Sequence, residues 1–466
     1  MRSGAKQVPF GVVVFDLLET EVVSPGLCTH CGTCVGLSSG SLEMVSTPWG
    51  PIPSPVPLKT ITLSPIAFDV CPGKGINYPD LCLDVFGQHP ENWLVGCYRN
   101  IHVGYSRVPQ IRRLGASGGV ITQTLVYLLD QGLIDGAVVV CHGRTNPWQA
   151  EPIIARSMDE IMASSQSVYR PVPVNTILTE MESFNGKLAY VGLPDQVASL
   201  RRLQELGHQG AQKVEYVLGP YVGTNMYFSA IESYLRSNGI RNKEEITRLR
   251  YREGEWPGHL QIETRAGKEL RVKKFYYNYL IPFHVTRSTL LAVDFTNELT
   301  DISVGDAWHP RYEVAGGGVS VVITRSKKGE NVLSSMQQSQ LINMDEISLI
   351  EAMSMHGHML DLKKRGTFIR MNWRKAMGKH IPDYGYSPKY IPVSRKLVEV
   401  IVSLAFAMCG TRTARKLVEF MPIGIIGPLF DMVRKVWKNV SKPTKRGGLH
   451  NLEFDVRPPV PLRNDR

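Results

Sequence analysis

Cysteines at regular spacing are the strongest chemical signal in this chain of 466 residues. Cys28, Cys31 and Cys34 stand at C-x₂-C-x₂-C spacing in GLCTHCGTCVG, and Cys71 precedes a proline in DVCPGKG. A triplet of this kind, completed by a Cys-Pro, is typical of ferredoxin-type iron–sulfur clusters. We therefore predict a [4Fe–4S] cluster on these four thiolates, and with it electron transfer. The alternative is a structural Cys₄ zinc site, although such sites usually combine two separated C-x₂-C pairs.

A glycine-rich turn is the second chemical signal. GASGGVIT (115–122) places Ser117, Gly118 and Gly119 at the start of an expected helix. Backbone N–H groups at a helix start can cradle a phosphate, and the hydroxyls of Ser117 and Thr122 could add hydrogen bonds. The alternative is a tight turn without a ligand. The chain lacks GxxxxGK followed by Ser or Thr, and it lacks GxGxxG after a strand, which argues against the common nucleotide-binding loops.

A second strand-to-helix turn carries GLPDQ (192–196), with Gly192, Pro194 and Gln196 as candidate ligand-binding residues. Turns at the carboxyl ends of strands in open α/β sheets collect ligands. Asp195 in this turn is a candidate N-cap for the following helix.

A third polar segment is DFTNELTDISVGDAW (294–308). Its Thr296, Asn297 and Asp306 could hydrogen-bond a cofactor. The alternative is a turn whose polar groups satisfy one another.

The elements that must position these residues alternate in type. Helical spacing of apolar residues and β-branched runs follow one another through 115–135, 136–142, 186–194, 195–206, 213–223 and 226–240, which predicts an α/β core. We expect a small antiparallel excursion at 241–275, strands joined by a turn at 300–308 and 317–333, and mostly helices at 334–380. The fold class is α/β with α+β elements. Its expected parts are a ferredoxin-like cluster-binding region (1–105), the core (106–385) and a basic helical extension (386–466).

Charge is concentrated near the end of the chain. The net charge is +11, and residues 391–466 hold 14 Lys and Arg against 6 Asp and Glu. The apolar segments 396–408 and 414–440 lie in this part, and Pro422, Gly424 and Gly427 are expected to break the second one. Basic amphipathic segments can lie in a membrane interface, pack on the core or bind a partner. We expect peripheral membrane contact rather than specific nucleic-acid binding, and a chain ending near Pro388 that keeps its cofactors.

Cysteine usage and hydropathy indicate the cellular compartment in which the protein is expected. Eight Cys in a chain of this length are no disulfide framework, and cluster ligands need free thiols, so a reducing cytoplasm is expected. No apolar stretch reaches the roughly 18 to 20 residues of a membrane span, and residues 1–23 do not fit a signal peptide.

The motifs CTHCGTC, CPG, GASGGVITQTLVYLL, GLIDGAVV, GLPDQVASLR and DFTNELTDISVGDAW, in this order, resemble the coenzyme F420 hydrogenase/dehydrogenase beta-subunit family over residues 24–330. The resemblance implies an iron–sulfur flavoprotein oxidoreductase that passes electrons between the cluster, FAD and an organic or deazaflavin substrate. It implies ferredoxin or reduced deazaflavin as donor, and a possible partner redox subunit. FAD is then expected at Ser117, Gly118, Gly119, Thr122, Gly192, Pro194, Gln196, Thr296, Asn297 and Asp306.

The chain departs from the family pattern at three places. Two-cluster relatives have GxPCQ where this chain has Asp195, a Cys where it reads Val222, and C-x₂-C where it has Thr289 and Ala292. Their concerted loss predicts that no second cluster is built. Beside a flavin, Asp195 could accept a hydrogen bond or donate a proton, and it is the candidate catalytic residue.

Two further details bear on these departures. The remaining cysteines, Cys82, Cys97, Cys141 and Cys409, look scattered in the sequence and do not obviously replace the missing ligands. Val168 replaces a family lysine in SQSVYRPVPV (165–174), which excludes a lysine base at that position and leaves Tyr169 and Arg170 to face a cofactor or substrate.

Two other functions stay open at this point. One is an electron-input subunit of a larger complex, without an organic substrate of its own. The other is a zinc-stabilised scaffold that catalyses nothing.

Overall fold

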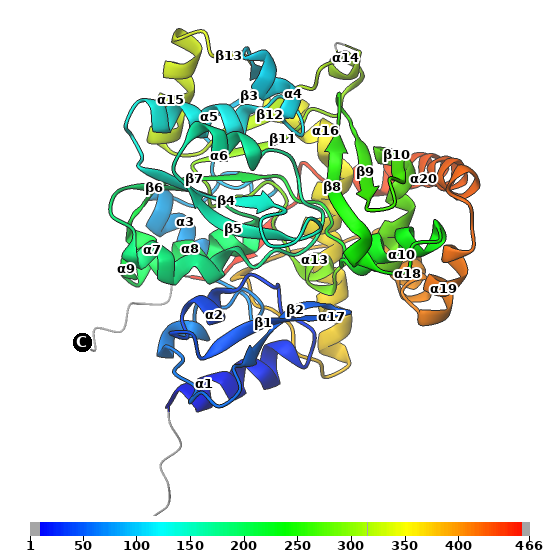
Figure 1. Ribbon diagram of the computed structural model, residues 1–466, viewed down its shortest axis with the longest axis horizontal. Coiled ribbons are helices and arrows are strands. Elements are labelled where there is room, and N and C mark those ends of the chain that lie inside the picture. Colours follow the sequence, from blue (N-terminus) through cyan, green and yellow to red (C-terminus); the bar gives the residue numbers. More distant parts are fainter. Residues whose placement is uncertain (1–9, 315, 459–466) are drawn as a thin grey trace, which may run out of the picture.

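A mixed sheet of eight strands forms the centre of the protein (Figure 1). The structure is a computed structural model and describes residues 10–314 and 316–458. The strand order is β13-β3-β12-β11-β7-β6-β4-β5. β4, β6, β7 and β11 are parallel, and β3 runs in the same direction because both it and β11 pair antiparallel with β12. The strands are β3 (Asn100–Ser106), β4 (Gly136–His142), β5 (Ala150–Ala155), β6 (Leu188–Val191), β7 (Val214–Pro220), β11 (Ile302–Asp306), β12 (Ser320–Thr324) and β13 (Ile342–Glu346).

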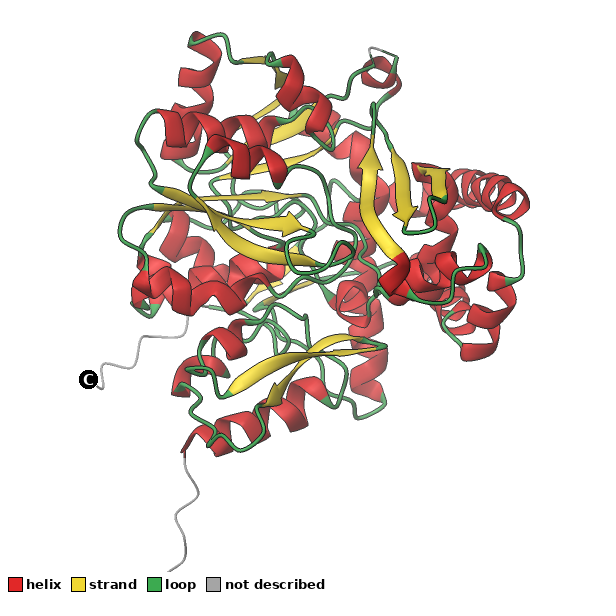
Figure 2. Cartoon of the chain, in the orientation of Figure 1, coloured by secondary structure: helices red, strands yellow, loops and turns green. Residues whose placement is uncertain are grey.

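Helices cover both faces of this sheet, as the red and yellow layers of Figure 2 show. The apolar sides of α3 (Tyr78–Phe86), α7 (Leu178–Ser183) and α8 (Pro194–Glu205) pack into the core on one face. On the other face lie α5 (Val120–Asp130), α6 (Met158–Ala163) and α15 (Lys327–Gln338). Short helical turns complete these connections: α4 (Pro109–Leu114), η3 (Val174–Ile177), α9 (Gln209–Gln212) and α14 (Pro310–Glu313). The α/β class predicted from the alternating pattern is therefore confirmed.

The N-terminal region forms a separate layer beside the sheet, drawn in blue in Figure 1. It consists of α1 (Phe10–Leu18), η1 (Glu19–Val23), α2 (Thr33–Gly36), the antiparallel pair β1 (Leu42–Thr47) and β2 (Gly50–Pro55), and η2 (Pro65–Ala67). The predicted boundary at residue 105 falls inside β3, which belongs to the central sheet.

A second, smaller sheet stands at one side of the molecule (Figure 1). Its strands β8 (Ile246–Glu253), β9 (His259–Thr264) and β10 (Glu269–Lys273) are antiparallel, as predicted for 241–275. Helices precede and follow it: α10 (Ser229–Ser237), η4 (Lys243–Glu245), α11 (Lys274–Tyr277), η5 (Asn278–Leu280), α12 (Ile281–His284) and α13 (Arg287–Leu291).

One element prediction was partly wrong. Strands β11 and β12 lie in the predicted segments and pair antiparallel, but residues 327–333 belong to helix α15, which follows β12 directly. The Ser326 hydroxyl accepts a hydrogen bond from the Gly329 N–H and caps the helix, and Val332, Leu333 and Met336 form its buried face. A capping serine with apolar residues at helical spacing outweighs the turn signal of the KKG sequence.

The C-terminal segment packs against the core. It follows α16 (Leu349–Asp361), η6 (Leu362–Gly366) and α17 (Thr367–Ala376), and contains α18 (Val393–Cys409), α19 (Arg412–Glu419) and α20 (Ile423–Arg446). β14 (Tyr386–Pro388) pairs with β15 (Phe454–Val456). The predicted break at Pro422 is confirmed, but α20 continues through Gly424 and Gly427. The predicted C-terminal coil lies partly outside the described residues.

Candidate functional site

The four predicted cluster thiols lie in two loops of the N-terminal region. Cys28 and Cys31 are in the turn from η1 into α2, Cys34 lies in the first turn of α2, and Cys71 follows η2. Gly32 takes a positive φ of 86° there, and a Cβ on it would come within 2.9 Å of the Pro173 carbonyl oxygen, so glycine lets the loop pack on the core.

The structure brings these four sulfurs close enough to influence one another. Burial raises the pKa of each thiol, and repulsion between the thiolates raises it further for Cys28, Cys34 and Cys71. The pKa of Cys71 rises to about 12. Ligand thiols must be deprotonated, so a bound cationic group would be needed to hold them in that form. Within residues 10–314 and 316–458, no three His, Cys, Asp or Glu side chains converge on the point of a single ion.

The remaining cysteines are not all scattered, which corrects the impression from the sequence. Cys82 and Cys97 lie in one core cluster, 1% and 3% exposed, and a hydrogen bond between their side chains shifts the pKa of both. Cys141 and Cys409 lie in β4 and α18.

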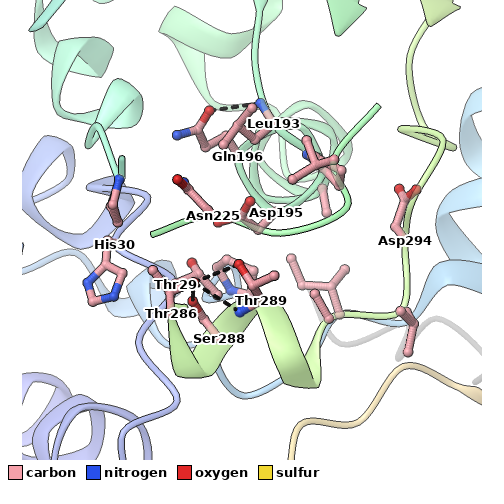
Figure 3. Close-up of a pocket in the computed structure, with 18 of the residues that line it drawn as sticks. Thr29, His30, Leu193, Asp195, Gln196, Asn225, Thr286, Ser288, Thr289 and Asp294 are labelled. Atoms are coloured by element: carbon pink, nitrogen blue, oxygen red, sulfur yellow. Dashed lines mark hydrogen bonds between the residues drawn. The ribbon is translucent and has the colours of Figure 1, made fainter. Parts of the chain in front are cut away.

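A small cavity of about 60 Å³ adjoins the thiol loops (Figure 3). Thr29 and His30 border it from the triplet loop, and Pro72 borders it next to Cys71. The turn at 192–196 forms another wall, and α13 contributes Thr286, Ser288 and Thr289. This volume suits a few water molecules and is far below the roughly 300 to 1,000 Å³ of typical ligand pockets.

The four departures from the family pattern that the sequence shows all line this one cavity. They are Asp195, Val222, Thr289 and Ala292, and they come from three different segments of the chain. Their side chains offer one carboxylate, one hydroxyl and two apolar groups, a set that a four-iron cluster does not use. None of the described residues that line the cavity is a cysteine.

Asp195 points into this cavity beside Asn225 and does not cap α8 (Figure 3). The helix begins at Pro194 with Leu193 as its N-cap, and Gln196 Oε1 accepts a hydrogen bond from the Leu193 N–H at 2.8 Å. The predicted N-cap role of Asp195 was therefore wrong. Burial raises the pKa of Asp195 to about 6, although the nearby Thr29 hydroxyl opposes the shift.

Lys363 shares the cavity and was missed in the sequence. Its Nζ donates a hydrogen bond to the Thr289 carbonyl oxygen at 2.7 Å, and burial lowers its pKa to about 7. It lies in the π-helical segment η6, with Lys364 and Arg365, and all three are buried. Three consecutive basic residues suggest a solvent-exposed surface when only the sequence is known. The structure shows a π-helical turn here, and such turns often mark functional sites. Asp195 and Lys363 thus line one cavity, and burial brings the pKa of each toward neutral pH.

A second, larger cavity of about 600 Å³ opens at the carboxyl end of β3. Ser117 and Gly115 line it together with Arg107, Arg112 and Arg113, and Trp256 closes one side. Within the described parts of the chain, neither Arg107 nor Arg113 pairs with a carboxylate. Its size and its basic lining suit a ligand that carries phosphates.

The glycine-rich turn contributes only Gly115 and Ser117 to the lining of this cavity, fewer residues than its sequence predicts. Ser117 Oγ lies 2.6 Å from Ser320 Oγ, which also accepts the Gly118 N–H at 2.9 Å. A Cβ on Gly118 would lie 2.6 Å from the Gly104 carbonyl oxygen, so this glycine is required by packing on β3. Thr122 is buried and lies 3.4 Å from Ser165 Oγ.

Asn297 and Thr296, which were also predicted to bind the cofactor, form hydrogen bonds to backbone groups at the edge of the sheet. Asn297 takes a φ of 60° and donates from Nδ2 to the Gly192 carbonyl oxygen at 2.8 Å, which ties the turn at 192–196 to β7. Thr296 Oγ1 donates to the Val95 carbonyl oxygen and accepts from Arg325. Pro194 and Gln196 line the small cavity, whereas Ser117 lines the large one. Of the ten predicted cofactor residues, these three line a cavity, and the other seven are in the lining of neither one.

Asp306 anchors a buried cationic cluster that the sequence did not reveal. Its carboxylate accepts from Arg252 at 3.0 and 3.1 Å and from Trp256 Nε1 at 2.8 Å. Lys274 Nζ lies 3.6 Å from the centre of the Tyr169 ring. Burial alone would raise the pKa of Tyr169, but the positive charges of Lys274 and Arg252 bring it below its ordinary value. A lysine does reach Tyr169, from α11 instead of position 168.

Comparisons with known proteins show which family the chain resembles. Residues 101–179 match the family model for the coenzyme F420 hydrogenase/dehydrogenase beta subunit N-terminus, and residues 185–349 match the model for its C-terminus. The chain is 24% identical over 387 residues to the coenzyme F420-dependent sulfite reductase of Methanocaldococcus jannaschii, a match over 78% of this chain and 55% of that protein. It is 25% identical over 268 residues to the coenzyme F420 hydrogenase subunit beta of Methanothermobacter thermautotrophicus, over 55% of this chain and 88% of that protein.

Among solved structures, a chain of the F420-reducing nickel–iron hydrogenase complex from Methanosarcina barkeri matches with a TM-score of 0.49 and 21% identity, over 63% of this chain and 98% of that one. The named relatives are oxidoreductases or their subunits, which defines the class. Within that class, the chain belongs to the coenzyme F420 hydrogenase/dehydrogenase beta-subunit family.

Proposed function

We propose that this protein is an iron–sulfur flavoprotein oxidoreductase with a single [4Fe–4S] cluster and FAD. The observation that carries the proposal is the gathering of four thiols, one buried and three half-buried, beside a cavity lined by the positions that depart from the two-cluster pattern. Cys28, Cys31, Cys34 and Cys71 would hold the cluster. When bound, the cluster and the flavin supply one-electron and two-electron chemistry respectively.

The large cavity is the proposed flavin site. Its 600 Å³ fall within the usual range of cofactor pockets, and Arg107, Arg112 and Arg113 could pair with a diphosphate. Arg112 is already oriented, because its guanidinium stacks on Tyr105 at 3.6 Å and donates to the carbonyl oxygen of Gly317. Trp256 connects this cavity to Asp306 through its indole N–H.

The chain's own groups would manage the protons that accompany electron transfer. At neutral pH the Asp195 carboxyl and the Lys363 amine each lie near their pKa, so either can give or take a proton. The small cavity that both side chains line has room for connecting water. The proposed substrate is an organic or deazaflavin acceptor, with ferredoxin or reduced deazaflavin as donor.

A second candidate is the electron-input subunit of a larger complex. The names of the hydrogenase relatives, which are subunits, favour it. Recovery of a stable complex with a second redox protein at native expression levels would support this candidate, whereas an active isolated chain would support the first.

Replacing single cysteines tests the proposal. Cys31→Ala should abolish the iron absorbance and leave flavin binding at least partly intact. Cys409→Ala changes a cysteine in α18 outside the set and should leave iron content unchanged. Equal iron in both variants would contradict the assignment, and zinc without iron in the wild-type protein would favour a structural scaffold.

A further inference from the structure

Helix α18 is amphipathic in the opposite sense to a helix of a water-soluble protein. The side that faces the protein carries Arg395 and Glu399, both fully buried. The side that faces outward carries Leu397, Ile401, Leu404 and Met408, which are 53–69% exposed. A helix in a soluble domain normally turns its apolar stripe inward.

The buried charges are fully engaged with one another. Arg395 lies 2.8 Å from both Asp361 and Glu399, Arg365 lies 2.8 Å from Asp361, and Arg370 pairs with Glu399. The network joins α18 to α16 and α17, so the orientation of the helix is fixed by buried ion pairs. Helices in lipid place ionisable residues in this way, facing the protein and paired.

Exposed apolar side chains also occur on the next two helices, which contact α18 and are drawn in orange to red in Figure 1. Single exposed apolar residues are ordinary, but a contiguous set marks an interaction surface. We call this set the apolar face. Besides the α18 residues, it comprises Leu417 (63% exposed), Phe420 (85%), Ile425 (65%), Met432 (57%), Val436 (58%) and Val440 (70%).

The charges around the apolar face have one sign. Residues 393–446 contain eleven Lys and Arg against three Asp and Glu. Each of the three acidic side chains is already paired: Glu399 with Arg395, Glu419 with Arg236, and Asp431 with Arg434 and Lys435. The charge left to meet a partner is basic, so a complementary partner is anionic and presents apolar material beneath its charged layer.

We propose that the apolar face docks into the interface of a lipid bilayer with anionic headgroups. Within the described chain no single helix is long and apolar enough to cross a membrane; α18 and α19 reach that composition only as a pair bent by 71°. A surface that lies in the interface needs neither length nor straightness. Apolar side chains would enter the acyl boundary, and lysines such as Lys416 and Lys442 would meet the headgroups.

Vesicle flotation with the full chain tests this surface. At low salt the wild-type chain should float with vesicles of phosphatidylcholine and phosphatidylglycerol, and weakly or not at all with phosphatidylcholine alone. Leu404→Asn combined with Met408→Asn should weaken binding to the anionic vesicles at least tenfold. Ile350→Asn is the matched control, because Ile350 is 78% exposed on α16 and is not part of the apolar face, so its variant should bind as the wild type does.

A variant with fewer charges and a measurement of the oligomeric state distinguish membrane binding from a protein interface. Lys416→Gln combined with Lys442→Gln should weaken binding at low salt by roughly tenfold and have less effect at high salt. Absence of vesicle binding by the folded wild-type chain would overturn the proposal. Vesicle binding that the Leu404/Met408 variant retains would overturn it too. If that variant instead converts a dimer into a monomer and the wild type does not float, the apolar face is a protein interface.

Discussion

At the residue scale, the site depends on side chains that lie far apart in the sequence. Asp195 was identifiable, because it stands where relatives have a thiol in a strand-to-helix turn. Lys363 was not, because Lys-Lys-Arg inside a helical segment reads as a solvated face, and only its packing against Thr289 reveals its burial. Cysteine spacing is a local signal and was readable, whereas the approach of Lys274 to Tyr169 is a long-range contact.

Asp195→Asn tests the proton role. The amide cannot exchange a proton, so turnover should fall by about 10² to 10⁴, the usual contribution of a general acid or base. The limb of the pH profile near pH 6 should disappear, since burial raises the pKa of Asp195 to about 6. Asp159→Asn, on exposed α6, is the control. A variant with full iron, full flavin and an unaltered pH profile would restrict Asp195 to a structural role.

Arg113→Gln tests the large cavity as the flavin site. The loss of a positive charge that could pair with phosphate should reduce flavin affinity by about 10-fold or more, as expected for a charge-assisted hydrogen bond worth about 1.5 to 3 kcal/mol. Flavin content after dialysis measures this loss of affinity, with Arg156→Gln as the control. Gly118→Val is a poorer test, because the added side chain would meet the Gly104 carbonyl oxygen and disturb β3. Equal flavin retention by both arginine variants would move the site elsewhere.

At the element scale, the sequence pattern predicted the parallel strands and the helices between them. Periodicity and capping are local, so β4, β6, β7, α8 and α10 were readable. The α15 error arose because a turn-like sequence also began with a good N-cap. The edge strand β13 was missed, since its place in the sheet depends on pairing with β3 and not on its own residues.

His284 in helix α12 leads to a prediction about how the stability of the fold changes at acid pH. Burial lowers the pKa of His284 to about 3, while in the unfolded chain it titrates near 6.5. The stability associated with the neutral ring is complete above pH 6.5 and falls by about 1.4 kcal/mol per pH unit as the pH drops toward 3. His284→Gln should reduce the slope of unfolding free energy against pH over this range by about that amount, measured by urea denaturation. The exposed His450→Gln should not, and equal slopes in His284→Gln and the wild type would contradict the argument.

At the scale of the whole molecule, the C-terminal segment is attached by more than its apolar surface. Arg395 and Glu399 complete the buried ion network, and β15 returns to pair with β14. Net charge and hydropathy located this segment, but they could not predict that Arg395 and Glu399 face inward.

A chain ending at Pro388 should therefore be damaged, in contrast to the expectation from the sequence. Asp361 would lose Arg395 and Arg370 would lose Glu399, and breaking buried pairs costs about 3 to 5 kcal/mol. Arg365 would lose the carbonyl oxygens of Lys445 and Gly447. We expect aggregation or a strongly lowered melting temperature, seen by gel filtration and thermal denaturation. A monodisperse truncated chain with normal iron and flavin would show that the core does not need this segment.

The most direct test of the central claim is the cofactor content of the anaerobically purified full chain. Iron, sulfide, zinc and flavin should be quantified together with the paramagnetic signals after reduction. We predict about four iron and four sulfide, as for one cubane cluster, with one flavin per chain and one paramagnetic centre. About eight iron with two distinct centres, or zinc in place of iron, would contradict the single-cluster flavoprotein.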